Sequence, residues 1–116
     1  MAADFGGTRN PMVMHWPDGF KAKGEIRTQF HHVNDVAATI LEATTLPQPK
    51  MVNGIVQKPL TGVSMLYAAH DVKAPDRHRT QYFEIAANRA IYYDGWLARV
   101  IHRVPWESKP MRTLQE

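Results

Sequence analysis

Six histidines are the first side chains to consider as carriers of chemistry in this 116-residue sequence, which contains no cysteine. Without cysteine the chain has no disulfide, no thiolate zinc site and no cysteine nucleophile of its own. His31 and His32 are adjacent, so their side chains diverge on a helix or strand and rarely bind one ion together. The other four are isolated, and HExxH and His-x-His spacings are absent. We predict structural or surface roles, no metal ligands, and His31 or His32 facing a cleft as the alternative.

Carboxylates and a glycine pair provide two further candidates. Asp35 and Glu42 fall on one predicted helix, seven residues apart and near opposite ends, so Asp35 is interpreted as a helix cap rather than an acid–base residue. Gly6 and Gly7, followed by Arg9, could hold an anion through backbone N–H groups and the guanidinium. The segment lacks the GxxxxGK[ST] pattern of a phosphate-binding loop, so it indicates no nucleotide site.

Composition excludes several classes of protein. The sequence is 44% hydrophobic and 22% charged, which is typical of one globular domain or of a piece of a larger one. Its net charge is +3 and its pI about 9.4, but the basic residues are scattered and form no patch. We therefore predict no nucleic-acid partner. A run of about 18 apolar residues is lacking, so no membrane partner is expected.

Three kinds of element are predicted along the chain. Residues 11–16 form a short apolar run bounded by turns, which favours a buried strand. Apolar residues at helical spacing predict an amphipathic helix that ends before Pro47; they are Val33, Val36, Ala37, Ile40 and Leu41. Residues 80–85, 89–93 and 96–104 predict an antiparallel meander, and residues 63–69 a short helix.

These elements make a poor self-contained core. The predicted first strand has no neighbouring strand in sequence with which to pair, and a buried strand needs a sheet to join. We infer that this sheet lies outside the chain. The predicted helix and meander each have one apolar face and could pack on each other as a small core.

Several segments, in this order along the chain, resemble the C-terminal region of sulfatases. Residues 6–17 resemble the family's Gly-Gly-x-Arg-x-Pro, apolar strand and Trp-Pro segment. Residues 32–41 look like its His-x-x-Asp-x-x-x-Thr-x-Leu helix. The following loop is similar at residues 53–54, 57–60 and 62–64, and residues 82–84, 88–92 and 94–96 resemble the end of bacterial arylsulfatases. The resemblance covers the chain from about Phe5 to Glu107.

The resemblance implies an alkaline-phosphatase-like α/β fold with a smaller C-terminal antiparallel sheet. It implies hydrolysis of sulfate esters by a formylglycine together with a divalent cation, usually calcium. The formylglycine of the family comes from a [Cys/Ser]-x-Pro-x-Arg motif. Residues 108–112 fit that motif literally, but only four residues follow, too few for the helix that helps to hold the anion. We therefore expect this match to be accidental.

The family's catalytic and metal-binding residues have no counterparts here, so none is carried over. Gly6, Gly7 and Arg9 match a segment near the family's active site, and a positioning role is expected for them. The predicted organisation is residues 1–30 as the end of the main α/β domain, 31–107 as the C-terminal helix and meander, and 108–116 as a disordered tail.

The sequence thus predicts the C-terminal fragment of an arylsulfatase, inactive alone, whose partner is the missing N-terminal sulfatase domain. Calcium and a sulfate ester would belong to the complete enzyme. The first alternative is a stand-alone, non-catalytic binding or interaction module derived from a sulfatase end. A second alternative, a small metal-binding protein that uses His31 and His32, lacks supporting ligand spacing.

Overall fold

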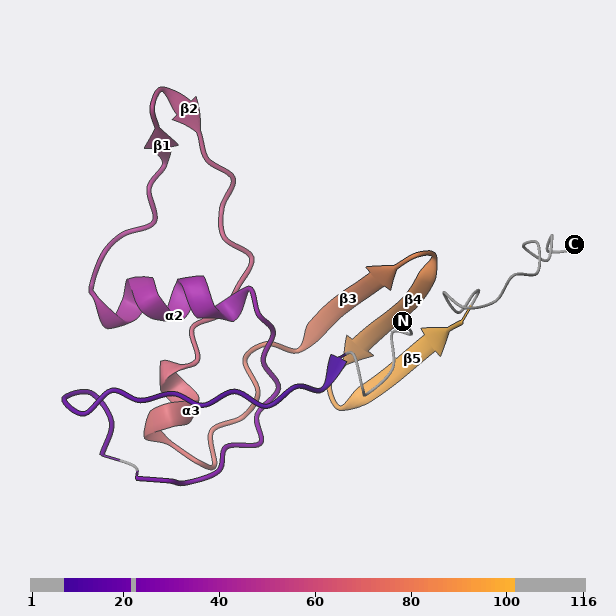
Figure 1. Ribbon diagram of the computed structural model, residues 1–116, viewed down its shortest axis with the longest axis horizontal. Coiled ribbons are helices and arrows are strands. Elements are labelled where there is room, and N and C mark those ends of the chain that lie inside the picture. The colour runs from indigo at the N-terminus through magenta and orange to yellow at the C-terminus, as the bar shows by residue number, and fades with distance from the viewer. Residues whose placement is uncertain (1–7, 22, 102–116) are drawn as a thin grey trace, which may run out of the picture. The chain divides into compact units, whose positions relative to one another are not determined.

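A computed structural model describes residues 8–21 and 23–101, which include short helices and two small antiparallel sheets (Figure 1). The chain divides into two units. One comprises residues 14–78, and the other combines the chain up to Val13 with the chain from Arg79 onward. None of the helices in the described ranges is long and apolar enough to cross a membrane.

The second of these units contains a three-stranded meander. Strands β3 (Thr80–Ile85), β4 (Asn88–Tyr93) and β5 (Trp96–Val100) pair antiparallel in sequence order, which confirms the predicted meander. The predicted third strand extended to Val104, which lies outside the described residues.

The two turns of the meander fix its register. Asp94 and Gly95 both have positive φ (49° and 92°), as a two-residue hairpin turn requires. Ala86 and Ala87 also have positive φ, which is unfavourable for alanine. The Glu84 carboxylate accepts the backbone N–H of Ala87 at 2.9 Å and so stabilises this turn.

The unit of residues 14–78 is built around two helices. Helix α2 (Asp35–Ala43) confirms the predicted helix, and α3 (Leu66–His70) confirms the shorter one. A two-stranded hairpin, β1 (Met51–Val52) and β2 (Ile55–Val56), projects from the end of the loop after α2 (Figure 1). Among the described residues of this unit, the buried apolar ones are consecutive and belong to α3 and its N-cap; they are Met65, Leu66, Tyr67 and Ala68.

The predicted buried face of α2 is wrong. The buried residues of α2 are Asp35 and Thr39, whereas Val33 and Ile40 of the predicted apolar face are 73% and 57% exposed. Hydrogen bonds from buried backbone groups to Asp35 and Thr39 turn this side of the helix toward α3.

The predicted strand at residues 11–16 is also not formed. These residues have no strand hydrogen bonding, and Val13 is 94% exposed. Among the described strands none pairs with this segment, and an extended chain without a partner gains no ladder bonds. The turn that follows is present, with the Trp16 ring packed over Gly19, where a Cβ atom would come within 2.1 Å of the ring.

Candidate functional site

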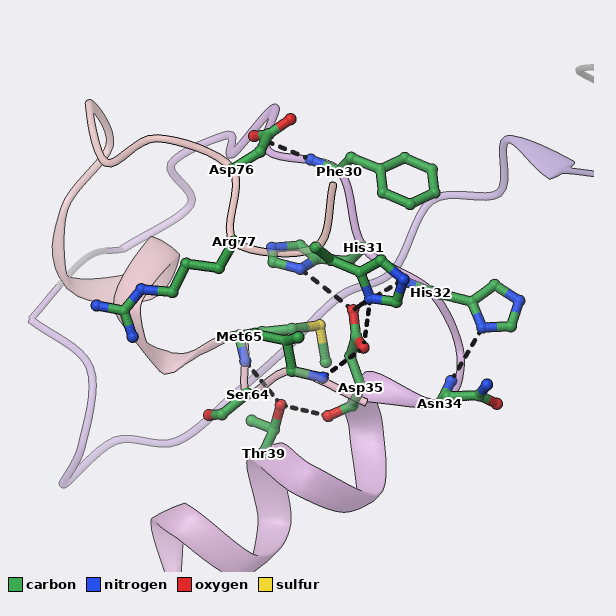
Figure 2. A network of polar contacts seen from close by, with 12 residues as sticks. Phe30, His31, His32, Asn34, Asp35, Thr39, Ser64, Met65, Asp76 and Arg77 are labelled. Atoms are coloured by element: carbon green, nitrogen blue, oxygen red, sulfur yellow. Dashed lines mark hydrogen bonds and ion pairs between the residues drawn. The ribbon is translucent and has the colours of Figure 1, made fainter. Parts of the chain in front are cut away.

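A buried carboxylate is the centre of a network of polar contacts in the residue 14–78 unit (Figure 2). Oδ2 of Asp35 accepts the backbone N–H of His32 at 2.9 Å, and Oδ1 accepts that of Val63 at 2.8 Å. Nδ1 of His78 lies 2.8 and 2.9 Å from the two carboxylate oxygens. Nδ1 of His31 is 3.6 Å from Oδ2, an ion-pair distance but too long for a hydrogen bond. We call these five residues the Asp35 junction.

The junction joins three segments that are distant in sequence. Asp35 is the first residue of α2, and the two histidines before it lead into the helix. Val63 belongs to the loop that enters α3, and His78 follows the loop after α3. Asp35 is therefore not the N-cap residue that was predicted, because Asn34 occupies that position and makes no side-chain cap bond. The Asp35 carboxylate instead binds partners that are distant in sequence, Val63 and His78.

A glycine makes this close approach possible. A Cβ atom on Gly62 would lie 2.1 Å from the backbone oxygen of Asn34 and 3.0 Å from Cα of Asp35. The loop backbone thus packs directly against the first peptide of α2, which brings the next amide, that of Val63, to the carboxylate. Any side chain at this position would push the loop away.

A second buried contact lies one helical turn further along α2. The Thr39 hydroxyl donates to the carbonyl oxygen of Asp35 at 2.6 Å and accepts the backbone N–H of Met65 at 2.9 Å (Figure 2). Met65 is the N-cap residue of α3 and is 2% exposed. Because its N–H has no earlier helical carbonyl to bond, Thr39 supplies the acceptor that the start of α3 needs.

Aromatic rings enclose the imidazoles. The His78 ring packs edge-on against the Phe30 ring, with 5.5 Å between the ring centroids. The centroid of the His32 ring lies 6.2 Å from that of the His78 ring. The His31 ring packs edge-on against Tyr67 at 5.8 Å. An ionised carboxylate can only accept, so Nδ1 of His78 carries the proton in this pair.

The charge states follow from burial and contacts. Burial by itself raises the pKa of Asp35, but the backbone N–H groups of His32 and Val63, together with His78, outweigh it and leave the pKa below its ordinary value. Burial lowers the pKa of His31 and of His32, and the attraction of Asp35 offsets this only in part. At neutral pH the carboxylate is charged while His31 and His32 are neutral.

The junction is arranged to hold segments together rather than to perform chemistry on a ligand. Its carboxylate is fully buried and already accepts two amides and one imidazole. In the parts of the chain that the structure describes, no group of three His, Cys, Asp or Glu side chains could hold a metal ion.

The candidate residues predicted from the sequence do not form one site. His31 and His32 both belong to the junction: Nδ1 of His31 lies 3.6 Å from the Asp35 carboxylate, and His32 binds that carboxylate through its backbone N–H. Arg9 is exposed, and Gly6 and Gly7 lie outside the described residues, as does the predicted tail. His78 was missed, because it lies 43 residues from its partner and no local spacing reveals the pair.

An open apolar groove lies on the other side of α2. It has a volume of about 390 Å³ and lies between the helix and the segments that flank the hairpin. Its apolar lining comes from Ala37, Ile40, Leu41, Pro49 and Leu60. The hairpin itself exposes all four of its strand residues, Met51, Val52, Ile55 and Val56. This side of the unit therefore presents apolar surface of the kind that proteins normally cover.

The chain matches no protein-family model, and the comparisons with curated proteins and with solved structures give no significant match.

Proposed function

We propose that this chain is the C-terminal portion of an arylsulfatase-like enzyme, a non-catalytic part of an alkaline-phosphatase-like α/β protein. In this proposal it completes the fold of a sulfatase domain whose nucleophile and metal ligands lie elsewhere. The complete enzyme would hydrolyse sulfate esters with a formylglycine and calcium, and this part alone would be inactive.

The observation that supports the proposal is the position of the motif residues. Asp35 and Thr39 are the acidic and hydroxyl residues of the sulfatase-like His-x-x-Asp-x-x-x-Thr segment, and they are the two buried residues of α2. Their partners Val63 and Met65 belong to, or directly follow, the sulfatase-like Gly-Val-Ser segment. The residues that suggest the family thus bind one another in the folded chain.

Exposed apolar surface is a second support. Val13, Val33 and Ile40 are more than half exposed although their patterns predicted burial. The groove beside α2 is also open and lined largely by apolar side chains. A complementary sulfatase domain would cover such surfaces, whereas a stand-alone interaction module would leave them to a different partner.

An activity assay tests the catalytic part of the proposal. The purified chain, incubated with an aryl sulfate and calcium, should release no phenol above the rate without protein. The matched variant Ser108→Ala removes the serine of the accidental Ser-x-Pro-x-Arg match and should behave identically. Turnover by the parent chain that is lost in this variant would overturn the proposal.

Hydrodynamic behaviour separates the two candidate functions. A fragment should aggregate, or require an added sulfatase N-terminal domain to stay soluble, because its apolar surfaces lack cover. A stand-alone module should elute as one defined species and melt cooperatively. The coding sequence upstream gives the most direct test: a continuous reading frame that includes Cys-x-Pro-x-Arg supports the fragment, and a stop codon there favours the module.

A further inference from the structure

We propose that Asn53, at the tip of the β1–β2 hairpin, is a site of spontaneous covalent modification, where the side-chain amide becomes a carboxylate through a cyclic imide formed with the backbone of Gly54. This inference does not depend on the proposed sulfatase ancestry, because it follows from the position and the chemistry of these two residues. It concerns only the hairpin of the residue 14–78 unit (Figure 1).

The turn between β1 and β2 exposes the two reacting groups. Asn53 and Gly54 are the only residues between the strands, and both are exposed. Their φ angles are 50° and 80°, as a type I′ hairpin turn requires. A Cβ atom built on Gly54 would meet nothing within 4 Å. The backbone nitrogen of Gly54 is therefore shielded neither by a side chain of its own nor by another part of the chain.

Few interactions hold the hairpin, so its turn can open to the reactive geometry. Each strand has two residues, and all four of their side chains are exposed. An isolated two-stranded hairpin is at best marginally stable in water. Exposed backbone bonds without buried apolar contacts are typical of a segment that opens locally. Opening frees the backbone of Asn53, and its side-chain carbonyl carbon can then reach the next backbone nitrogen.

The reaction is a ring closure followed by hydrolysis. The backbone nitrogen of Gly54 loses its proton to solvent and forms a bond to Cγ of Asn53. The Cγ–Nδ2 bond breaks, and Nδ2 takes up a proton from water and leaves as ammonia. Water then opens the imide at either carbonyl, which yields aspartate or isoaspartate. The net change replaces –NH₂ with –OH without any oxidant or cofactor, and the cyclic intermediate divides one difficult hydrolysis into two easier steps.

The other three asparagines each lack one of these conditions. Asn10 precedes a proline, which has no backbone N–H. Asn34 precedes Asp35, whose amide already donates to a backbone carbonyl at 2.9 Å. Asn88 is fully buried in β4. All four asparagines lie within the described ranges, and an exposed amide followed by an unshielded backbone nitrogen occurs among them only at Asn53.

Both products would change the hairpin. Aspartate places a negative charge at the tip of a turn that is neutral in the unmodified chain. Isoaspartate inserts a methylene group into the backbone, so a two-residue turn no longer closes the pair of Val52 and Ile55 in register. Because the strands carry four exposed apolar side chains, the modification alters the apolar side of this unit.

Peptide mapping by mass spectrometry tests the proposal on the full chain incubated at pH 8 and 37 °C. The peptide that contains Asn53 should gain one mass unit with time and should include an isoaspartate form, which the cyclic route produces and direct hydrolysis does not. Gly54→Ala should slow this gain about tenfold, because its Cβ atom hinders attack by the backbone nitrogen. Gly24→Ala is the matched control and should leave the gain unchanged, because Gly24 is also exposed with positive φ but follows a lysine.

Two results would overturn the proposal directly: no gain at Asn53 after several weeks, or aspartate without isoaspartate. An equal rate in the parent chain and in Gly54→Ala would also overturn it. A second measurement does not depend on how the variants fold. Because the hairpin opens readily, the rate in the folded parent chain should lie within about tenfold of the rate in guanidinium chloride. A larger difference would show that the turn stays closed and would refute the inference.

Discussion

Replacing Asp35 with alanine is the sharpest test of how the residue 14–78 unit is held together. The change leaves three donors without their acceptor: the amides of His32 and Val63 and Nδ1 of His78. An unsatisfied buried donor costs about 1–3 kcal/mol, and the substitution leaves three such donors. Since local relaxation will recover part of the sum, we expect a loss of about 4 kcal/mol.

That loss is large for a unit with so small a core. Whole domains are stable by only about 5–15 kcal/mol, and in the described part of this unit the buried apolar side chains belong to α3 and its N-cap. Asp35→Ala should therefore leave the unit largely unfolded at 37 °C. Asp35→Asn should be intermediate, because its amide keeps one acceptor oxygen but turns an N–H₂ group toward donors.

Urea unfolding followed by Trp16 fluorescence measures this effect within the unit. Trp16 packs edge-on against Phe20 at 5.5 Å, and Trp96→Phe with Trp106→Phe would remove the other two tryptophans. Glu42→Ala, at an exposed position of the same helix, is the control and should change stability by less than about 0.5 kcal/mol. If Asp35→Ala unfolds within 1 kcal/mol of that control, the carboxylate does not organise the unit.

Three further substitutions test individual contacts. Thr39→Val removes the acceptor of the α3 N-cap amide and should lower the free energy of unfolding in urea by about 1–3 kcal/mol. The control Thr44→Val loses only an exposed hydroxyl and should lower it clearly less. Equal losses in the two variants would contradict the role of Thr39. Gly62→Ala forces a Cβ atom against the carbonyl of Asn34 and should lower the free energy of unfolding by about 2–3 kcal/mol. A change below about 0.5 kcal/mol would show that the loop is free to move. Asp94→Asn breaks an exposed ion pair but tolerates the positive φ, so the melting temperature of the meander should not change; a clear drop would disprove this.

Much of the secondary structure could be predicted because its signals are local. The turn dipeptide Asp94–Gly95 marks the β4–β5 hairpin by its tolerance of positive φ, and alternating β-branched and aromatic residues mark the strands around it. The helical spacing of apolar residues placed α2, and Pro47 excluded its continuation. Each of these signals acts over a few neighbouring residues.

The strand predicted at residues 11–16 shows the limit of such signals. An apolar run bounded by turns is consistent with a strand, but a strand exists only when another backbone pairs with it. Val13 remains exposed, and the segment forms no ladder with any described strand.

Sequence alone therefore determined where the helices and the meander lie, because backbone preferences and turn chemistry depend on adjacent residues. Only the tertiary structure decided which side of α2 is buried and which histidine bonds the Asp35 carboxylate. The amide of Val63, the amide of Met65 and the ring of His78 reach α2 from 28, 26 and 43 residues away, respectively. Because buried donors must find acceptors wherever the chain brings them together, these non-local bonds reversed the face that the apolar spacing predicted.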